Sequence, residues 1–194
     1  YGATDSTLNL LSSTGTNARL DVSASVYGYD PAYGLYRSSL ISGTGNDNIS
    51  IEVNSQIERF NSLSFNPNSS SSHLQATVLE EGNLETGEGD DEINLAAAAQ
   101  RSTDLWDSVT YEVNGLINST VNAGSGNDRL TLDLSSPTQA SALSNSIVLL
   151  GEGDDQMSFN GSFTGSTVDG GDGHDFLAIN GTSFSSYSFE ERSN

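Results

Sequence analysis

Five aspartates recur in one sequence setting, Gly-x-Gly-x-Asp-x-apolar-x-apolar, and they are the residues best suited to bind a metal. Each follows two glycines, which permit backbone dihedrals that a side chain forbids and leave their carbonyl oxygens uncovered. Carboxylate and carbonyl oxygens are the ligands of calcium, which takes roughly six to eight of them. The candidate primary ligands are Asp47, Asp91, Asp128, Asp155 and Asp175. The paired glycines are Gly43, Gly45, Gly87, Gly89, Gly124, Gly126, Gly151, Gly153, Gly171 and Gly173.

One such turn supplies too few oxygens for calcium, whereas two stacked turns supply enough. The sequence therefore predicts a row of calcium ions between neighbouring turns, with carbonyls near the glycines completing each shell. The residue before each aspartate is a helper ligand or a solvated neighbour, and Asp172 inside the last turn is a further candidate. These neighbouring residues are Asn46, Asp90, Asn127, Asp154 and His174.

The elements that position the turns are indicated by the apolar residues on both sides. Apolar residues spaced by two are typical of a strand with one buried face. They stand six and eight residues after the first glycine, at Ile49/Ile51, Ile93/Leu95, Leu130/Leu132, Met157/Phe159 and Leu177/Ile179. Another aliphatic residue precedes each turn, at Leu40, Leu84, Val121, Val148 and Val168. Each unit therefore reads as strand, acidic turn, strand.

Repetition of this unit predicts an all-β fold, a parallel right-handed β-solenoid of about six coils with calcium stacked along one edge. A degenerate first coil starts at Thr14, with Leu20 and Val22 in the core and Ala18 in place of aspartate. The coil starts, at residues 14, 43, 87, 124, 151 and 171, are spaced by 29, 44, 37, 27 and 20 residues, so the solenoid should taper toward its C-terminus.

The longer coils are expected to contain additional strands, because alternating patterns occur at Leu63/Phe65, 74–78 and 109–113. A short helix is considered at 96–99, and each coil is expected to have two sides. We expect one domain over 1–194. Within it, 1–42 hold the degenerate coil and a Tyr-rich insertion, 43–180 the calcium-binding coils, and 181–194 a C-terminal strand or cap.

Composition limits the function classes. The net charge is −20, with six Arg and no Lys, so no basic patch can form for nucleic acid. The absence of Cys excludes disulfides and thiolate metal sites. No apolar run approaches the ~18 residues of a membrane span. Divalent cations would offset the self-repulsion of so acidic a chain.

The motif resembles the nonapeptide calcium repeat of the repeats-in-toxin family, Gly-Gly-x-Gly-x-Asp-x-apolar-x. Residues 170–178 match it fully, whereas the other four copies replace the first glycine by Ser42, Thr86, Ala123 and Leu150. The resemblance implies a parallel β-roll, calcium binding and a bacterial protein that is secreted and folds outside the cell. Family repeats run in tandem, giving two metal edges. With one motif per coil, only one metal edge is expected here.

These features favour an extracellular structural module, rigidified by calcium and self-associating end to end into a fibre, matrix or adhesin, without enzymatic activity. One alternative is an accessory or catalytic module of a polysaccharide-modifying enzyme, which the scarcity of basic residues disfavours. Another is an adhesin tip that binds a polysaccharide or cell-surface partner through the Tyr-rich segment 26–36. The simplest alternative is that the turns only reverse the chain, which five copies in register make less attractive.

Overall fold

The computed structural model describes residues 3–4, 7–9, 17–27, 30–57, 72–101, 109–136, 138, 140–181, 184–185 and 188–192. Its regular elements are β-strands in three sheets, here A, B and C. Sheet A contains β1 (Ala3–Thr4), β4 (Ala32–Tyr36), β7 (Ser72–Glu80), β10 (Val109–Ile117), β13 (Ser141–Ser144), β16 (Ser162–Thr164) and β19 (Phe184–Ser185).

Sheet B contains β2 (Thr7–Asn9), β5 (Ser39–Thr44), β8 (Asn83–Glu88), β11 (Thr120–Ser125), β14 (Ile147–Glu152), β17 (Thr167–Asp172) and β20 (Ser188–Arg192). Sheet C contains β3 (Arg19–Tyr27), β6 (Asn48–Ile57), β9 (Glu92–Arg101), β12 (Arg129–Ser135), β15 (Gln156–Asn160) and β18 (Phe176–Asn180). The chain visits A, B and C in turn, and each strand pairs in parallel with the strands one coil before and after it. The fold is therefore an all-β parallel solenoid, as the repeats predict.

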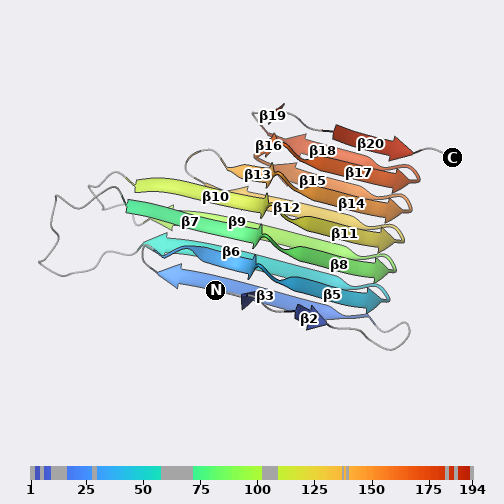
Figure 1. The fold of residues 1–194 in the computed structure, drawn as a ribbon, viewed down its shortest axis with the longest axis horizontal. Coiled ribbons are helices and arrows are strands. Elements are labelled where there is room, and N and C mark those ends of the chain that lie inside the picture. Colours follow the sequence, from blue (N-terminus) through green and yellow to red (C-terminus); the bar gives the residue numbers. More distant parts are fainter. Residues whose placement is uncertain are drawn as a thin grey trace, which may run out of the picture.

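Each complete coil contains three strands, with the strands of sheets A and B on one side and the strand of sheet C on the other (Figure 1). Figure 1 shows the strands of sheets A and B pointing one way, one after the other, and those of sheet C pointing back. A corner separates A from B, and its first residue has a left-handed backbone, with φ between 47° and 60°. These first corner residues are Arg37, Glu81, Asn118, Asn145 and Gly165.

The second corner residue is a buried serine in four of these five coils: Ser38, Ser119, Ser146 and Ser166. Each hydroxyl donates to the carbonyl two residues earlier, over 2.7 to 3.0 Å. Three of them also accept an N–H from the preceding coil, over 3.0 to 3.2 Å. Gly82 interrupts this ladder of serines.

Restoring the ladder by Gly82→Ser should stabilise the protein by about 1 kcal/mol, because it adds a buried hydrogen bond and removes glycine flexibility. A Cβ at this position meets its nearest neighbour, the Ser38 carbonyl oxygen, at 3.4 Å, which is ordinary contact. Urea unfolding measures the change. Ser146→Gly makes the reverse exchange at a later corner and should lower the free energy of unfolding by a similar amount. A lower midpoint for Gly82→Ser would contradict this account of the corner.

The core lies between sheet C and the other two sheets, and the predicted apolar rows form it. The aliphatic residues before the turns are fully buried in β5, β8, β11, β14 and β17. The pairs after the turns are buried in β6, β9, β12 and β15. In β18, by contrast, Leu177 is half-buried and Ile179 is 40% exposed. This difference arises because β18 is the last strand of sheet C among the described residues.

In the five coils that contain an acidic turn, strand length changes in sheets A and C and stays constant in sheet B. The sheet B strands β5, β8, β11, β14 and β17 all have six residues. In sheet C the length falls from 10 residues in β9 to 7 in β12 and 5 in β15. In sheet A it falls from 9 in β10 to 4 in β13 and 3 in β16. The coils thus differ in the part that lies away from the acidic turns.

The patterns at 74–78 and 109–113 lie in β7 and β10, so they are long forms of the strand that sheet A has in every coil. The helix considered at 96–99 is wrong, because these alanines belong to β9 and pair with β6 and β12. In the first coil, Leu20 and Val22 pair with Ile49 and Ile51 as predicted. Thr14, Leu63 and Phe65 lie outside the described residues.

Candidate metal centre

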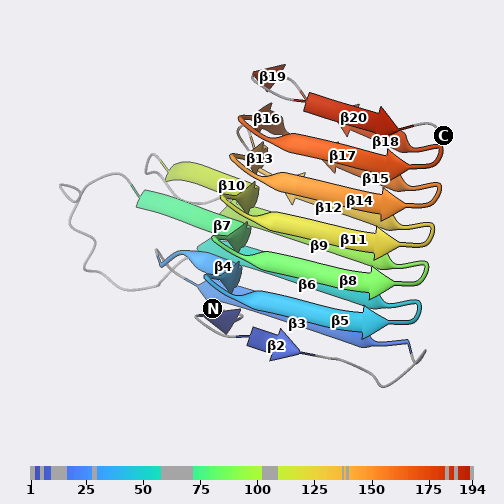
Figure 2. The same cartoon turned by 45° about the vertical axis from the view of Figure 1, so that its right-hand side comes forward.

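The five acidic turns lie in register along one edge, where sheet B passes into sheet C. Their first glycines are mutually paired through β5, β8, β11, β14 and β17. Figure 2 shows these turns stacked along the same side of the solenoid. Adjacent strands in a sheet are about 4.8 Å apart, so equivalent turn residues stand one above the other at that spacing. The turns therefore form one continuous edge, as the motif alignment predicts.

All ten predicted glycines have positive φ, between 93° and 140°. They also allow very close stacking. A Cβ on Gly87 or Gly89 would come closer than 3.0 Å to the carbonyl oxygen of the matching glycine in the preceding coil, Gly43 or Gly45. The same holds for the later coils. Glycine is thus required twice over, by backbone conformation and by the carbonyl oxygens that lie between the turns.

The aspartates point into the solenoid. Asp47, Asp91 and Asp128 are 2% exposed and Asp155 is 0% exposed. Each Oδ1 accepts a backbone N–H from the preceding coil. The donors to Asp91, Asp128, Asp155 and Asp175 are the aspartates one coil earlier, over 2.7 to 3.0 Å. Asp47 accepts from Ala18 over 2.6 Å. One carboxylate oxygen of every aspartate therefore caps the turn before its own.

The second carboxylate oxygen has no such partner. Each Oδ2 atom is inaccessible to solvent and accepts no hydrogen bond; the five residues are Asp47, Asp91, Asp128, Asp155 and Asp175. Glycine stacking and turn capping explain why Gly and Asp occur in the motif without any metal. They leave this row of buried oxygens unexplained, and unpaired buried polar atoms are rare and costly.

The residues before the aspartates lie on the opposite, solvent-exposed side of the turn. Their side chains cap the turn of the following coil, whereas the buried aspartates cap the turn of the preceding coil. Side-chain oxygens of Asn46, Asp90, Asn127 and Asp154 accept the N–H of the matching residue in the next coil, over 2.8 to 3.0 Å. Asp172, at the end of β17, is also exposed. The structure thus brings the five aspartates together and places these predicted helpers outside their row.

The residue just before the first glycine is a neighbour that the motif did not single out as part of the site. A Cβ on Gly170 would run into Oδ2 of Asp175, so this carboxylate lies directly over position 170. In the preceding coils this position holds Ser42, Thr86, Ala123 and Leu150. The Thr86 hydroxyl donates its one proton to the carbonyl of Ala123, over 2.7 Å. The one sign of this position in the sequence is that it holds residues other than the first glycine of the repeats-in-toxin motif in four of the five copies.

Burial controls the electrostatics of the row. Burial raises the pKa of Asp91. It also raises the pKa of Asp128 to about 7 and the pKa of Asp155 to about 6. The N–H that each carboxylate accepts acts against this shift, and the neighbouring carboxylates add to it. The nearby Thr86 hydroxyl also lowers the pKa of Asp91, although its proton is donated to the carbonyl of Ala123 and not to Oδ2. Ionisation of these three carboxylates therefore costs more in the folded protein than in water, and a bound proton or cation offsets that cost.

Within the described residues, no group of three or more His, Cys, Asp or Glu side chains is arranged to hold a metal. The donors that accompany the aspartates at this edge are instead the backbone carbonyls between the turns and the hydroxyls of Ser42 and Thr86. This set consists of hard oxygen donors, the chemistry that suits calcium.

Comparison with known proteins adds no relative. No family model, curated protein or solved structure matches the chain. Within the described ranges there is no helix long and apolar enough to cross a membrane.

Proposed function

We propose that the row of buried aspartates binds calcium ions between neighbouring coils and that these ions rigidify the solenoid. The observation that carries this proposal is the repetition of one unpartnered, buried Oδ2 in five successive coils. A single atom of this kind can be tolerated, whereas five in a row at about 4.8 Å spacing need a common source of positive charge.

The donor set agrees with calcium. Each pair of neighbouring coils offers two carboxylates, and glycine carbonyls lie in the same layer. Five aspartates in consecutive coils make four such pairs, and an ion between two coils shares both aspartates. Bound calcium supplies positive charge that keeps the carboxylates ionised. The aspartates provide the anionic oxygens, and the glycines allow the turns to approach closely enough to share an ion.

The functional role we propose is that of a structural module, secreted and stiffened by extracellular calcium, without enzymatic activity. The resemblance of the turns to repeats-in-toxin sequences and the net charge of −20 support this role. We also propose that the solenoid is right-handed, has about six coils and holds calcium along one edge. Self-association through the ends, and a polysaccharide or cell-surface partner, remain predictions of the same role.

Calcium binding should follow the pairing of the aspartates. Calcium titrated into protein that a chelator has freed of metal should bind at about four ions per chain, as measured by calorimetry. Four are expected because the five carboxylates form four neighbouring pairs. Asp128→Asn should remove about two of them, since Asp128 belongs to two pairs, and Asp175→Asn about one. Asparagine keeps Oδ1 for capping and replaces the anionic Oδ2 by an uncharged NH2 group.

Asp90→Asn is the matched control, because Asp90 lies one residue from Asp91 on the exposed side of the turn. Its calcium stoichiometry should equal that of the unchanged protein. Equal losses in Asp90→Asn and Asp128→Asn would show that calcium binds the acidic surface and leaves the buried row empty. Absence of binding at millimolar calcium would refute the proposal outright.

A further inference from the structure

The row of buried aspartates runs beside a second column of side chains, formed by the residue directly before the first glycine of each turn. We call this place the pre-glycine position. All five of its residues are buried, and the first four have no exposed surface. In chain order they are Ser42, Thr86, Ala123, Leu150 and Gly170. The buried edge is thus built from constant Gly and Asp residues and from a column that differs in every coil.

Two observations place this column against the unpartnered Oδ2 atoms. A Cβ on Gly170 would meet Oδ2 of Asp175 in the same coil. In an earlier coil, the Thr86 hydroxyl lies close enough to Asp91 to lower its pKa. The turn glycines are paired in register from β5 to β17, so each pre-glycine residue takes the equivalent place beside the aspartate of its coil. The column therefore lines the proposed calcium sites.

The two hydroxyls of the column face the gap between their own coil and the next one. The Ser42 hydroxyl donates to the carbonyl of Thr86 over 3.1 Å, and the Thr86 hydroxyl donates to the carbonyl of Ala123 over 2.7 Å. A hydroxyl has one proton and two acceptor lone pairs, so this donation leaves its lone pairs for a cation. Each hydroxyl therefore brings one more oxygen to a gap between neighbouring aspartates.

The two later gaps lack this oxygen. Between the coils of Gly124 and Gly151, the residue in the same place is Ala123. Between the coils of Gly151 and Gly171, it is Leu150. Both side chains belong to the hydrophobic core and carry no polar atom. The four gaps are otherwise alike, because each offers two aspartates and the carbonyls of the turn glycines.

We propose that the pre-glycine residue determines the calcium affinity of each gap, so that the row holds two tight sites followed by two weaker ones. The tight sites are the gaps beside Ser42 and Thr86, and the weaker sites are the gaps beside Ala123 and Leu150. Calcium takes roughly six to eight oxygens, and a site that supplies more of them from a rigid scaffold binds it more tightly. This inference rests on the proposed calcium row and adds the order in which the row fills, from the N-terminal side.

Two measurements resolve the classes of site. Calcium titrated into metal-free protein and followed by calorimetry should bind in two phases of about two ions each, with affinities about tenfold or more apart. Terbium bound in place of calcium reports, through its luminescence lifetime, how many water molecules each ion keeps. The first two equivalents of terbium should keep about one water fewer per ion than the last two, because a protein hydroxyl replaces that water.

Exchanges at the pre-glycine position should move sites from one class to the other. Thr86→Val removes the hydroxyl at nearly constant volume and should reduce the tight class from two ions to one. Thr86→Ser keeps the hydroxyl and should keep two tight ions. Ala123→Ser supplies a hydroxyl to the third gap, where the carbonyl of Leu150 can accept its proton, and should raise the tight class to three. The gain in Ala123→Ser tests the inference even if loss of the Thr86 hydroxyl unfolds the protein.

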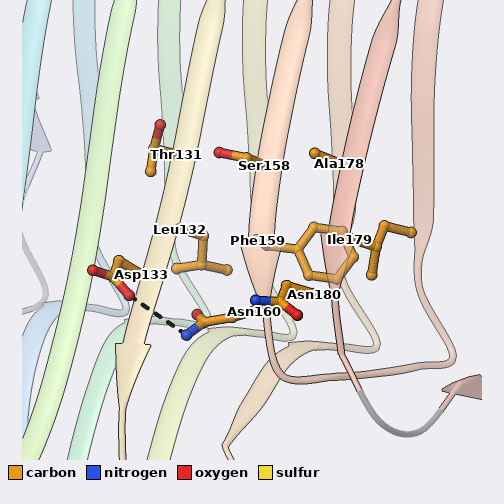
Figure 3. Close-up of a pocket in the computed structure, with 9 residues that line it drawn as sticks. All are labelled: Thr131, Leu132, Asp133, Ser158, Phe159, Asn160, Ala178, Ile179 and Asn180. Carbon is orange, nitrogen blue, oxygen red and sulfur yellow. Dashed lines mark hydrogen bonds between the residues drawn. The ribbon is translucent and has the colours of Figure 1, made fainter.

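Thr131→Val is the control for the exchange itself, because it removes a threonine hydroxyl from a half-buried position three residues after Asp128. Thr131 alternates with the buried residues Leu130 and Leu132 along β12, so its side chain lies on the outer face of sheet C. Figure 3 shows it in one row with Ser158 of β15 and Ala178 of β18. Both classes of calcium site should be unchanged in this variant.

Ser119→Ala is the control for the lost hydrogen bond. Its buried hydroxyl also donates to a backbone carbonyl, that of Ile117, over 2.7 Å, but at the corner before β11 and away from the turns. This variant should lower the urea midpoint and leave both phases of calcium binding in place. A change in the tight class equal to that in Thr86→Val would show that general destabilisation, and not a lost ligand, weakens binding.

The outcomes separate this inference from the calcium row on which it rests. Four equivalent sites, or two classes that Thr86→Val and Ala123→Ser both leave unchanged, would overturn the inference and leave the row in place. Repulsion between neighbouring ions also splits a titration into phases, but it would do so equally in every variant that keeps the five aspartates. Failure of the protein to bind calcium at all would overturn the row and the inference together.

Discussion

In EDTA, the protein is expected to be more stable at pH 5 than at pH 8, and in millimolar calcium this order is expected to reverse. The folded-state pKa of Asp128 is raised to about 7 and that of Asp155 to about 6, against an ordinary value of 3.8. Between these limits the folded chain binds more protons than the unfolded chain. Its free energy of unfolding without calcium therefore falls as the pH rises through this window.

With calcium bound, the sign is opposite. The cation favours the ionised carboxylates, so protons compete with it, and the free energy of unfolding should rise from pH 5 to pH 8. Thermal unfolding followed by circular dichroism at both pH values, with EDTA and with calcium, measures all four conditions. At pH 8, removal of calcium should lower the midpoint by on the order of 10 °C or more, because several sites lose their ligand together.

Two variants separate the buried row from the general acidity of the chain. Asp128→Asn combined with Asp155→Asn should largely remove the pH dependence in EDTA and lower the stabilisation by calcium. Asp90→Asn combined with Asp154→Asn removes two charges from the exposed side of the same turns and should leave both effects in place. The same direction of pH dependence with and without calcium would contradict the assignment of the row as a calcium site.

Gly124→Ala should destabilise the protein by about 3 kcal/mol or more, with or without calcium. Gly124 has φ of 110°, which is strained for alanine, and its new Cβ would overlap the carbonyl of Gly87 in the preceding coil. The new Cβ is fixed to the backbone of β11 and the carbonyl belongs to the backbone of β8, so a side-chain rotation cannot relieve the clash. Urea unfolding at fixed pH measures the loss.

Gly82→Ala is the matched control, because Gly82 directly precedes the sheet B strand β8, has no positive φ and leaves room for a methyl group. A Cβ at this position would lie 3.4 Å from its nearest neighbour. The free energy of unfolding of this variant should change by less than about 1 kcal/mol. Similar losses in both variants would mean that glycine flexibility, and not the close stacking of the turns, determines the stability of this edge.

The rows of apolar residues beside the turns could be predicted from the sequence because a strand pleat imposes a period of two. Ile49 and Ile51 illustrate this, and their partners in the neighbouring coils follow from the same alignment. The corner between sheets A and B was harder to foresee. Its left-handed residue is Arg37 in one coil, Glu81 in the next and Asn118 after that, so no residue type marks this position itself, and only the serine that follows it in four of five coils recurs.

The candidate site could likewise be predicted from the sequence only in part. The motif identified Asp91 and its equivalents, but a linear pattern does not reveal that Asp91 faces the interior while Asp90 faces solvent. The two directions of capping are also invisible in the sequence, because they depend on how one coil lies over the next. The alanines at 96–99 favour helix locally, yet pairing of β9 with strands on both sides determines their conformation.

The opposed directions of capping have a mechanical consequence. Asp128 holds the turn of the coil before it, and Asn127 holds the turn of the coil after it, so no coil can be pulled away without breaking contacts made by both. Under tension the chain would lengthen in discrete events, each releasing one coil. At about 3.4 Å per extended residue, a 20-residue coil yields roughly 70 Å and a 44-residue coil roughly 150 Å. The unequal coils would then act as a graded series of extensible links under load.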